Sequence, residues 1–314
     1  MRHGTSQNRQ EKHSGRRKTG RSQENIDAVQ AVLENNPSGL SCRVNTLGLP
    51  SATFNRIVRI DLRWHPYKMQ VRHQLKPGDF ARRTAFCEWF LEKNRNPRFL
   101  HNFVIGDEAG FAMNGQVNTQ NVRKYAPRKN QPEFPYDVNE SREKVTACAG
   151  LVGNGTLIGP FFFEQNVNRG SYLELLNESV LPELLREFNG QFADGRFQRL
   201  WWAQDGAPPH RSAEITDWLA EFFGDHVIAL QHDPEWPPRS PDLTPCDYFL
   251  WGYVKSKVFV SPPDSIDDLK NRISQTFIDL KANHGLIRRA VRDMIKRVNI
   301  CIERDGGHVE GKFG

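Results

Sequence analysis

The chain has 314 residues, of which 38% are hydrophobic and 11% aromatic, enough for one large domain with its own core and a smaller domain. No run approaches the roughly 18 consecutive apolar residues of a membrane span, and the polar start after Met1 lacks the apolar core of a signal peptide. The five cysteines are scattered and form no Cys-x-x-Cys pair, which argues against a disulfide framework and a zinc ribbon. We therefore expect an intracellular protein with reduced thiols and no membrane partner.

The net charge of +6 is unevenly distributed. Residues 1–22 contain seven Lys or Arg and one Glu, and residues 23–100 contain twelve against seven acids, so the rest of the chain is net acidic. A basic front suits a polyanion partner, and an acidic remainder suits a domain whose carboxylates serve another purpose. A solvated basic tail without a partner would have the same composition.

Residues 1–22 hold almost no apolar side chain, so we predict a disordered basic arm. A short basic run of this kind is typical of minor-groove arms and of nuclear import signals. We therefore predict a nuclear protein and DNA contacts from four residues of the arm: Arg16, Arg17, Lys18 and Arg21.

Residues 23–62 show helical apolar spacing and are predicted to form a helix-turn-helix domain. One helix is predicted from Gln23 to about Asn35 and a second around residues 40–47, followed by a turn at Gly48 and a third helix capped by Ser51. The outer face of the third helix carries side chains that suit base edges and phosphates: Thr53, Asn55, Arg56 and Arg59. The alternative is a small helical bundle with a polar surface.

Residues 63–98 are predicted to be a helical connector, with one amphipathic helix near residues 79–92. From residue 99 to 314 apolar runs alternate with turn residues, and Asn154–Gly155 between two such runs indicates a hairpin. The predicted fold class is α/β, a mixed sheet flanked by helices and preceded by a small all-α domain. We expect strands at 103–105, 145–152, 158–163, 200–203 and 226–230, and helices at 172–188, 212–223, 265–282 and 286–304.

Two acids follow short apolar runs in this region, and we expect both to lie at strand ends. Asp107 follows Phe-Val-Ile-Gly, and Asp205 follows Trp-Trp-Ala-Gln. Strand ends are where open α/β sheets place functional groups. Because successive side chains of a strand alternate, Glu108 and Gln204 are expected to point to the opposite face from these two aspartates.

A third acid, Asp247, is predicted near the start of a helix, because Pro245 suits a first helical position and Thr244 with Asp247 fits a capping box. For each of the three acids a cap or turn role is the alternative. We interpret Asp242 as a turn residue, and His210 as a packed or hydrogen-bonded histidine.

Three carboxylates from separate segments suit chemistry at a phosphodiester, which needs two hard cations about 3.5 to 4 Å apart. Other site types are poorly supported, since the sequence has no phosphate-binding Gly-x-x-x-x-Gly-Lys loop, no Gly-x-Ser-x-Gly elbow and no His-Glu-x-x-His motif.

Two longer motifs resemble the second and third catalytic blocks of mariner-like transposases of the Tc/mariner superfamily. These are Trp202-Ala-Gln-Asp-Gly-Ala-Pro-Pro-His210 and the segment from Trp236 to Gly252, and Gly106–Phe111 resembles the first block. The resemblance extends from about Ser14 to His308. It implies a ribonuclease-H-like catalytic domain over residues 99–314, with Asp107, Asp205 and Asp247 as catalytic ligands of two Mg²⁺, for which Mn²⁺ can substitute.

The implied function is metal-dependent DNA strand cleavage and strand transfer, that is, cut-and-paste transposition and DNA integration. The implied partners are terminal inverted repeats, target DNA and a second copy of the chain. Such transposases usually begin with two helix-turn-helix units, and the segment 14–22 looks like the linker between them, so the first unit is missing from this sequence. The third acid is Asp and is more distant from the second than in the mariner group, which indicates a divergent branch. The alternative is an N-terminally truncated or host-recruited DNA-binding protein without catalysis.

Overall fold

The computed structural model describes residues 19–35, 47–64, 74–113 and 143–309. The chain divides into two compact units, Met1–Val71 and Arg72–Gly314, and each is described by itself. The predicted boundaries after residues 22, 62 and 98 remain predictions. Within these ranges, no helix has the length and apolar character that a membrane crossing requires.

The first unit is built from α1 (Gln23–Asn35) and α3 (Ser51–Arg56), which continues as the wider turns of η2 (Ile57–Asp61); the short η1 (Thr19–Arg21) precedes them. Its core contains Val29, Leu33, Phe54, Ile57 and Val58. The predicted cap at Ser51 is wrong, because Pro50 occupies the N-cap position and makes no side-chain cap. The predicted helix at 40–47 lies outside the described residues except at its end, where Leu47 is in a turn.

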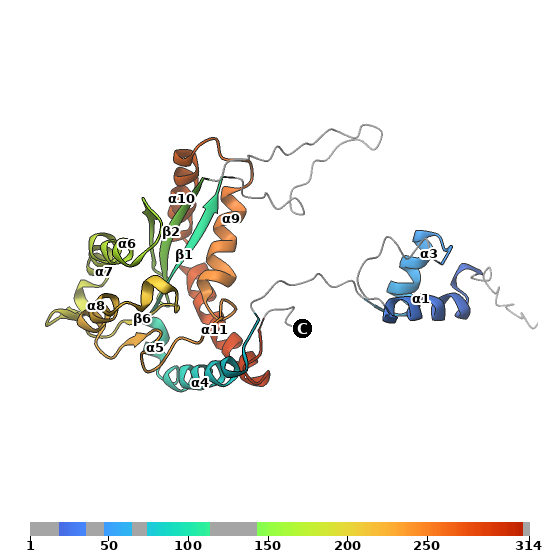
Figure 1. Cartoon of the computed structure of the whole chain (residues 1–314), viewed down its shortest axis with the longest axis horizontal. Helices are drawn as coiled ribbons and strands as arrows, with labels where there is room; N and C mark the ends of the chain where they lie inside the picture. Colours follow the sequence, from blue (N-terminus) through green and yellow to red (C-terminus); the bar gives the residue numbers. More distant parts are fainter. Residues whose placement is uncertain (1–18, 36–46, 65–73, 114–142, 310–314) are drawn as a thin grey trace, which may run out of the picture. The chain divides into compact units, whose positions relative to one another are not determined.

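The second unit contains a five-stranded sheet in the order β3-β2-β1-β6-β7 (Figure 1). The strands β1 (Phe103–Ala112), β2 (Lys144–Val152) and β3 (Leu157–Phe163) are antiparallel, whereas β6 (Trp201–Ala203) and β7 (Val227–Ile228) run parallel to β1. The predicted hairpin is confirmed, since Gly155 turns the chain at φ 101° and its amide donates to the Val152 carbonyl. A separate small hairpin pairs β4 (Phe192–Ala193) with β5 (Arg196–Phe197).

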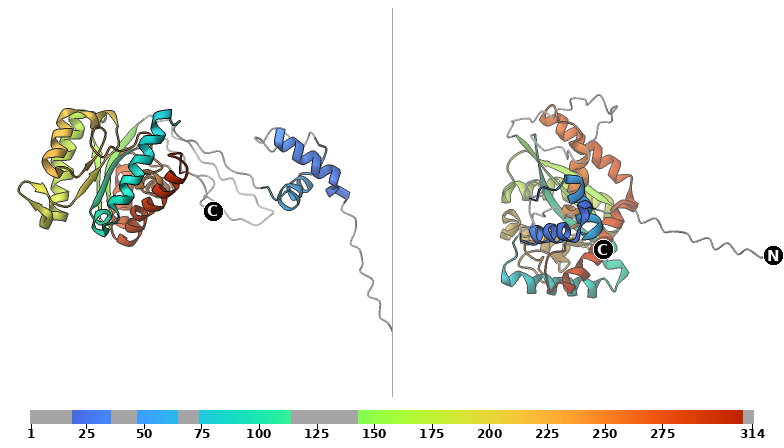
Figure 2. Two further views of the ribbon diagram at one scale, coloured as in Figure 1. Left: turned by 90° about the horizontal axis from the view of Figure 1, so that it is seen from below. Right: turned by 90° about the vertical axis from the view of Figure 1, so that its right-hand side faces the viewer.

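Helices cover both faces of this sheet, as Figures 1 and 2 show. One face carries α6 (Arg169–Leu175), η3 (Leu176–Val180), α7 (Leu181–Phe188) and α8 (Ala213–Phe223). The other carries α4 (Pro77–Lys93), α9 (Gly252–Val258), α10 (Ile266–Lys281) and α11 (His284–Glu303). The remaining short helices are α5 (Pro97–His101), η4 (Asn189–Gln191), η5 (Pro208–Arg211) and η6 (Cys246–Trp251). The α/β fold class is therefore confirmed.

Strand alternation divides the core into two hydrophobic clusters, one on each face. Val104 and Trp202 belong to the cluster under α6, α7 and α8, whereas Ile105 and Ala203 belong to the cluster under α4 and α11. The helix α4 begins at Pro77, whose fixed φ suits a first helical position, and the Lys76 amide donates to the Asp79 carboxylate at 2.7 Å.

A buried ion pair joins α4 to two later segments of the second unit. The Arg83 guanidinium lies 2.7 Å from the Asp242 carboxylate, and both side chains are 0% exposed. Arg83 also donates to the Ser240 hydroxyl at 2.6 Å and to the Gly306 carbonyl at 2.7 Å, while Asp242 accepts from the Val309 amide at 2.8 Å. Asp242 lies in a turn as predicted, but the sequence did not reveal that its side chain holds a buried charge.

The pKa of Asp242 shows the strength of this pairing. Burial opposes the charge of the carboxylate, yet the hydrogen bond and positive charge of Arg83 outweigh that effect and lower the pKa below its ordinary value. The pair therefore stabilises the folded chain above the ordinary aspartate pKa, and that stabilisation is lost as the pH falls through the lowered value.

We predict that Arg83→Met destabilises the second unit by about 3–5 kcal/mol, because it leaves the Asp242 carboxylate buried and unpaired. Denaturant unfolding monitored by tryptophan fluorescence measures this loss. The matched control is Arg82→Met, which removes a partly exposed pair with Glu235 and should cost at most about 1 kcal/mol. Equal losses in the two variants would contradict the assignment, as would a double variant Arg83→Met/Asp242→Leu no more stable than Arg83→Met.

Candidate active site

Asp107 and Asp205 lie at the same level of the sheet because of the register between β1 and β6. The last parallel pair is Ile105 of β1 with Ala203 of β6. Asp107 lies two residues after Ile105, and Asp205 lies two residues after Ala203. The prediction that Asp107 ends a strand is wrong, since β1 continues to Ala112 through its antiparallel pairing with β2. It is the parallel partner β6 that ends, so Asp107 lies beyond the parallel part of the sheet.

The prediction that the neighbouring residues face the other way is confirmed for Gln204, whereas Glu108 lines the same cavity as the aspartates. Gln204 is fully buried and its side-chain oxygen accepts from the Tyr172 hydroxyl at 2.9 Å and the Trp202 indole at 3.0 Å, both in the cluster under α6, α7 and α8. Asp107 instead accepts from the indole of Trp251, which belongs to the opposite cluster, at 2.9 Å.

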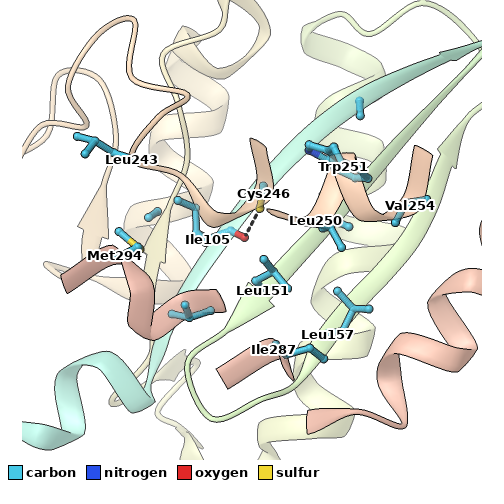
Figure 3. Close-up of a cluster of buried hydrophobic side chains, with 14 of the residues drawn as sticks. Ile105, Leu151, Leu157, Leu243, Cys246, Leu250, Trp251, Val254, Ile287 and Met294 are labelled. Atoms are coloured by element: carbon cyan, nitrogen blue, oxygen red, sulfur yellow. Dashed lines mark hydrogen bonds between the residues drawn. The ribbon is translucent and has the colours of Figure 1, made fainter. Parts of the chain in front are cut away.

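Asp247 is held near β1 by the packing of η6. In Figure 3 the Cys246 thiol points at the Ile105 carbonyl, to which it donates at 3.5 Å. Leu250 and Trp251, also in η6, are buried in the cluster under α4 and α11. The Thr244 hydroxyl oxygen accepts from the Cys246 amide at 3.2 Å, so the hydroxyl helps to begin this turn. The packing leaves Asp247 exposed on the outer side of η6.

One cavity of about 420 Å³ brings these acids together. Its lining includes all three predicted aspartates together with Glu108, which is not among the predicted site residues. The lining also includes the Pro-rich stretch from Trp236 to Pro241, and Thr244. The residues that lie far apart in sequence thus line a single recess at the carboxyl end of β6, as open α/β sheets commonly place their sites.

The cavity concentrates negative charge. Burial raises the pKa of Asp107 well above its ordinary value, and the charges of Asp247 and Glu108 raise it further. Carboxylate oxygens are the ligands that Mg²⁺ prefers, and a bound cation would relieve this repulsion, so the donor set fits a divalent metal. Across the described ranges, no three His, Cys, Asp or Glu side chains are already gathered closely enough to hold an ion.

His210 links two of the acids. Its Nδ1 lies 2.9 Å from Asp205 Oδ1, and its Nε2 lies 3.2 Å from Glu108 Oε2 without the alignment of a hydrogen bond. The ring contacts Tyr172, with centroids 4.4 Å apart. The prolines of η5 fold the chain back after Asp205 and place the histidine there. The predicted hydrogen-bonded role is confirmed, but the contact with Glu108 could not be read from the sequence.

His210 and Asp205 shift each other's pKa in opposite directions. Burial lowers the affinity of His210 for a proton, but the hydrogen bond and charge of Asp205 together with Glu108 overcome this and raise the histidine pKa to about 10. Burial likewise opposes the charge of Asp205, but the hydrogen bond and charge of His210, together with the Ala207 amide, outweigh it and lower the pKa of Asp205 below its ordinary value. The histidine is thus an imidazolium that neutralises part of the acidic cavity.

The predicted DNA-contacting residues lie in the first unit. Asn55, Arg56 and Arg59 are exposed and Thr53 is half-buried, whereas the Arg21 guanidinium pairs with the Asp61 carboxylate. The DNA-contact roles remain predictions. Three further predicted contacts lie outside the described residues: Arg16, Arg17 and Lys18.

We predict that the stability advantage of the wild type over His210→Gln is largest below about pH 6.5 and shrinks as the pH rises toward 10. The reason is that a pKa higher in the folded than in the unfolded chain stabilises the folded chain only while His210 is protonated. One unit of difference in pKa corresponds to about 1.4 kcal/mol. Unfolding free energies measured across this pH range test it. His226→Gln is the control with the opposite sign, because burial lowers the pKa of His226. A pH-independent difference for His210→Gln would refute the assigned ionisation.

The sequence is similar to two curated transposases, while no protein-family model matches it. Identity with the Mariner Mos1 transposase of Drosophila mauritiana is 23% over 249 residues, which cover 79% of this chain and 66% of the relative. Identity with the Transposable element Tcb1 transposase of Caenorhabditis briggsae is 26% over 184 residues, 56% of this chain and 59% of the relative. The matched stretch is therefore less than two thirds of the length of either relative.

Solved structures of a transposase are also similar to this chain. A Mos1 mariner paired-end complex with Mn is 20% identical with a TM-score of 0.70, covering 99% of this chain and 83% of that one. The catalytic domain of Mos1 mariner transposase is 21% identical with a TM-score of 0.57, covering 77% of this chain and all of that one. At these identities the likeness establishes the fold, which for the second unit is the ribonuclease-H-like fold. The chain is therefore similar in sequence to two transposases of the mariner and Tc type, and it shares the fold of the Mos1 mariner transposase.

Proposed function

We propose that the chain is a DNA transposase that cleaves DNA strands and transfers them to a target with the help of divalent metal. The observation that carries this proposal is the shared cavity, in which Asp107, Asp205, Asp247 and Glu108 meet from three separate segments. Three segments that are distant in sequence and converge on one acidic recess are the arrangement that two-metal phosphodiester chemistry requires.

Asp107, Asp205 and Asp247 would hold the metal, with two Mg²⁺ as the proposed complement and Mn²⁺ as a substitute. When bound, the ions would supply activation of the attacking oxygen and stabilisation of the leaving oxygen. Glu108 offers a fourth carboxylate to the same recess. The raised pKa of Asp107 supports this assignment, because crowded carboxylates retain protons until a cation replaces them.

The protein's own contribution is to orient these ligands before DNA arrives. The Trp251 indole fixes one oxygen of Asp107, and the Glu108 amide donates to the other at 2.9 Å. His210 holds Asp205 at 2.9 Å, and the Ala207 amide donates to the same carboxylate at 2.9 Å. Ligands that are already oriented need less rearrangement when charge develops on the phosphate, which is how preorganised sites lower a barrier.

The relatives indicate the partners we propose. Solved Mos1 structures include a paired-end complex with left transposon end, a strand transfer complex, and complexes with Mn and with Mg. By analogy, we propose that this chain binds terminal inverted repeats and target DNA as a homodimer in the nucleus. Residues 23–62 would form the helix-turn-helix domain, 1–22 the basic arm, 63–98 the connector and 99–314 the catalytic domain.

The test is nicking of supercoiled plasmid with Mg²⁺ or Mn²⁺, which needs no knowledge of the element's ends. We predict that the wild type nicks the plasmid and that Asp205→Asn lowers the rate by at least a hundredfold, because one of the metal-binding carboxylates is lost. Asp217→Asn is the matched control, since Asp217 is an exposed acid on α8 outside the cavity lining, and it should nick at the wild-type rate.

Two outcomes would count against this function. If Asp205→Asn nicks as fast as the wild type, the assignment of the acids is wrong. If the folded wild type binds DNA but shows no metal-dependent nicking, the chain is instead a non-catalytic DNA-binding protein, the alternative that the sequence left open.

A further inference from the structure

A basic surface lies at the end of the parallel strands opposite to the acids. A hollow of about 380 Å³ is lined by Trp201, the first residue of β6, and by His226, which precedes β7, together with residues of α4, α5 and the loop before β6. Trp201 precedes Asp205 by four residues, so at about 3.3 Å per extended residue the hollow and the acidic cavity are roughly 13 Å apart. The cationic lining residues are Lys93, Arg98, Arg199 and His226.

A second hollow of about 340 Å³ is also lined by residues of the segment 93–102. Lys93, Asn96 and Arg98 face the first hollow, whereas Asn94, Pro97 and His101 face the second. The far wall of the second hollow is formed by Gly153 and by two arginines of α11, Arg288 and Arg292. The two hollows therefore flank the short helix α5, and a helix with its side chains is roughly 10 Å wide.

Charge is not balanced on this surface. Neither lining contains Asp or Glu, in contrast to the cavity at the other end of β6. Of the carboxylates that the structure describes, none forms an ion pair with Lys93, Arg98 or Arg199. Asp225 is not part of the lining. Burial lowers the pKa of His226, and the charge of Asp225 acts in the opposite direction.

Aromatic rings fix the position of one of these cations. The Lys93 ammonium lies 5.8 Å from the Trp89 ring centroid and 5.7 Å from that of Trp201, and Trp201 stacks on His226 at 4.5 Å. The exposed amide of Asn96 adds a neutral hydrogen-bond donor to the same lining, whereas the Gln198 amide already donates to the Ala193 carbonyl at 2.8 Å. Cations with an amide donor and no carboxylate in the lining favour a ligand with repeated anionic oxygens.

We propose that this surface, lined by Lys93, Arg98, Arg199, Arg288 and Arg292, binds the phosphate backbone of double-stranded DNA. Arginine presents a planar fork of donors that matches phosphate oxygens, and two hollows on either side of α5 suit two phosphates of one duplex rather than one small anion. The surface is separate from the acids that we propose for cleavage, so it would hold DNA whether or not the chain cleaves it.

The test measures how the affinity of the full-length chain for a random-sequence duplex depends on salt, by fluorescence anisotropy. The variant Arg98→Gln/Arg199→Gln should weaken binding and reduce the slope of log affinity against log salt by about 1–2, since each lost phosphate contact changes it by about 0.9. The control Arg169→Gln/Arg186→Gln removes the same charge from side chains that are 64% and 66% exposed on α6 and α7, and should keep the wild-type slope.

Equal slopes for the wild type and Arg98→Gln/Arg199→Gln would overturn the proposal, as would an equal reduction in the control variant. Titration with inorganic phosphate and with polyglutamate identifies other ligands. If the variant loses binding to either probe while its DNA slope stays at the wild-type value, the surface is a small-anion or acidic-protein site instead. Failure here is distinguishable from failure of the cleavage proposal, because Asp205→Asn should lose metal-dependent nicking and still retain the full salt slope.

Discussion

The parallel pairing of β6 with β1 is the constraint on which the site depends. β6 has only three residues, yet its amides and carbonyls lie between β1 and β7, and Trp202 and Ala203 are buried on opposite faces. Because Ile105 pairs with Ala203, Asp107 and Asp205 emerge at one level. A register slip of one residue would turn one acid to the opposite face of the sheet and separate the pair.

The third acid depends on longer-range packing. Asp247 belongs to η6, which the Cys246 thiol and the buried Leu250 and Trp251 attach to β1. The turn that leads into η6 is tied to α4 and to the C-terminal segment by the buried pair of Arg83 with Asp242. Helix α4, which we had predicted as a connector, therefore helps to position the acidic cavity although it contributes no acid to its lining.

The second unit separates its charges along the parallel strands. Carboxylates gather beyond the end of β6, where their mutual repulsion and burial raise the pKa of Asp107. Arginines and Lys93 gather at the start of the same strand, with no acid in the lining. The proposed metal site and the proposed phosphate-binding surface therefore lie at opposite ends of the same strands, and a polyanionic substrate would experience different fields at the two ends.

Local signals were enough to predict much of the fold and to single out three acids that line one cavity. Apolar period, prolines and the Asn154–Gly155 turn predicted the strands and most helices, because these signals act between residues close in sequence. The extension of β1 past Asp107, the bridge from His210 to Glu108 and the pairing of Arg83 with Asp242 appeared only in the tertiary structure. Each of these depends on contacts between segments distant in sequence, whose burial and register no local pattern specifies. The sequence by itself therefore identified the candidate residues, whereas packing between distant segments decided how they are arranged.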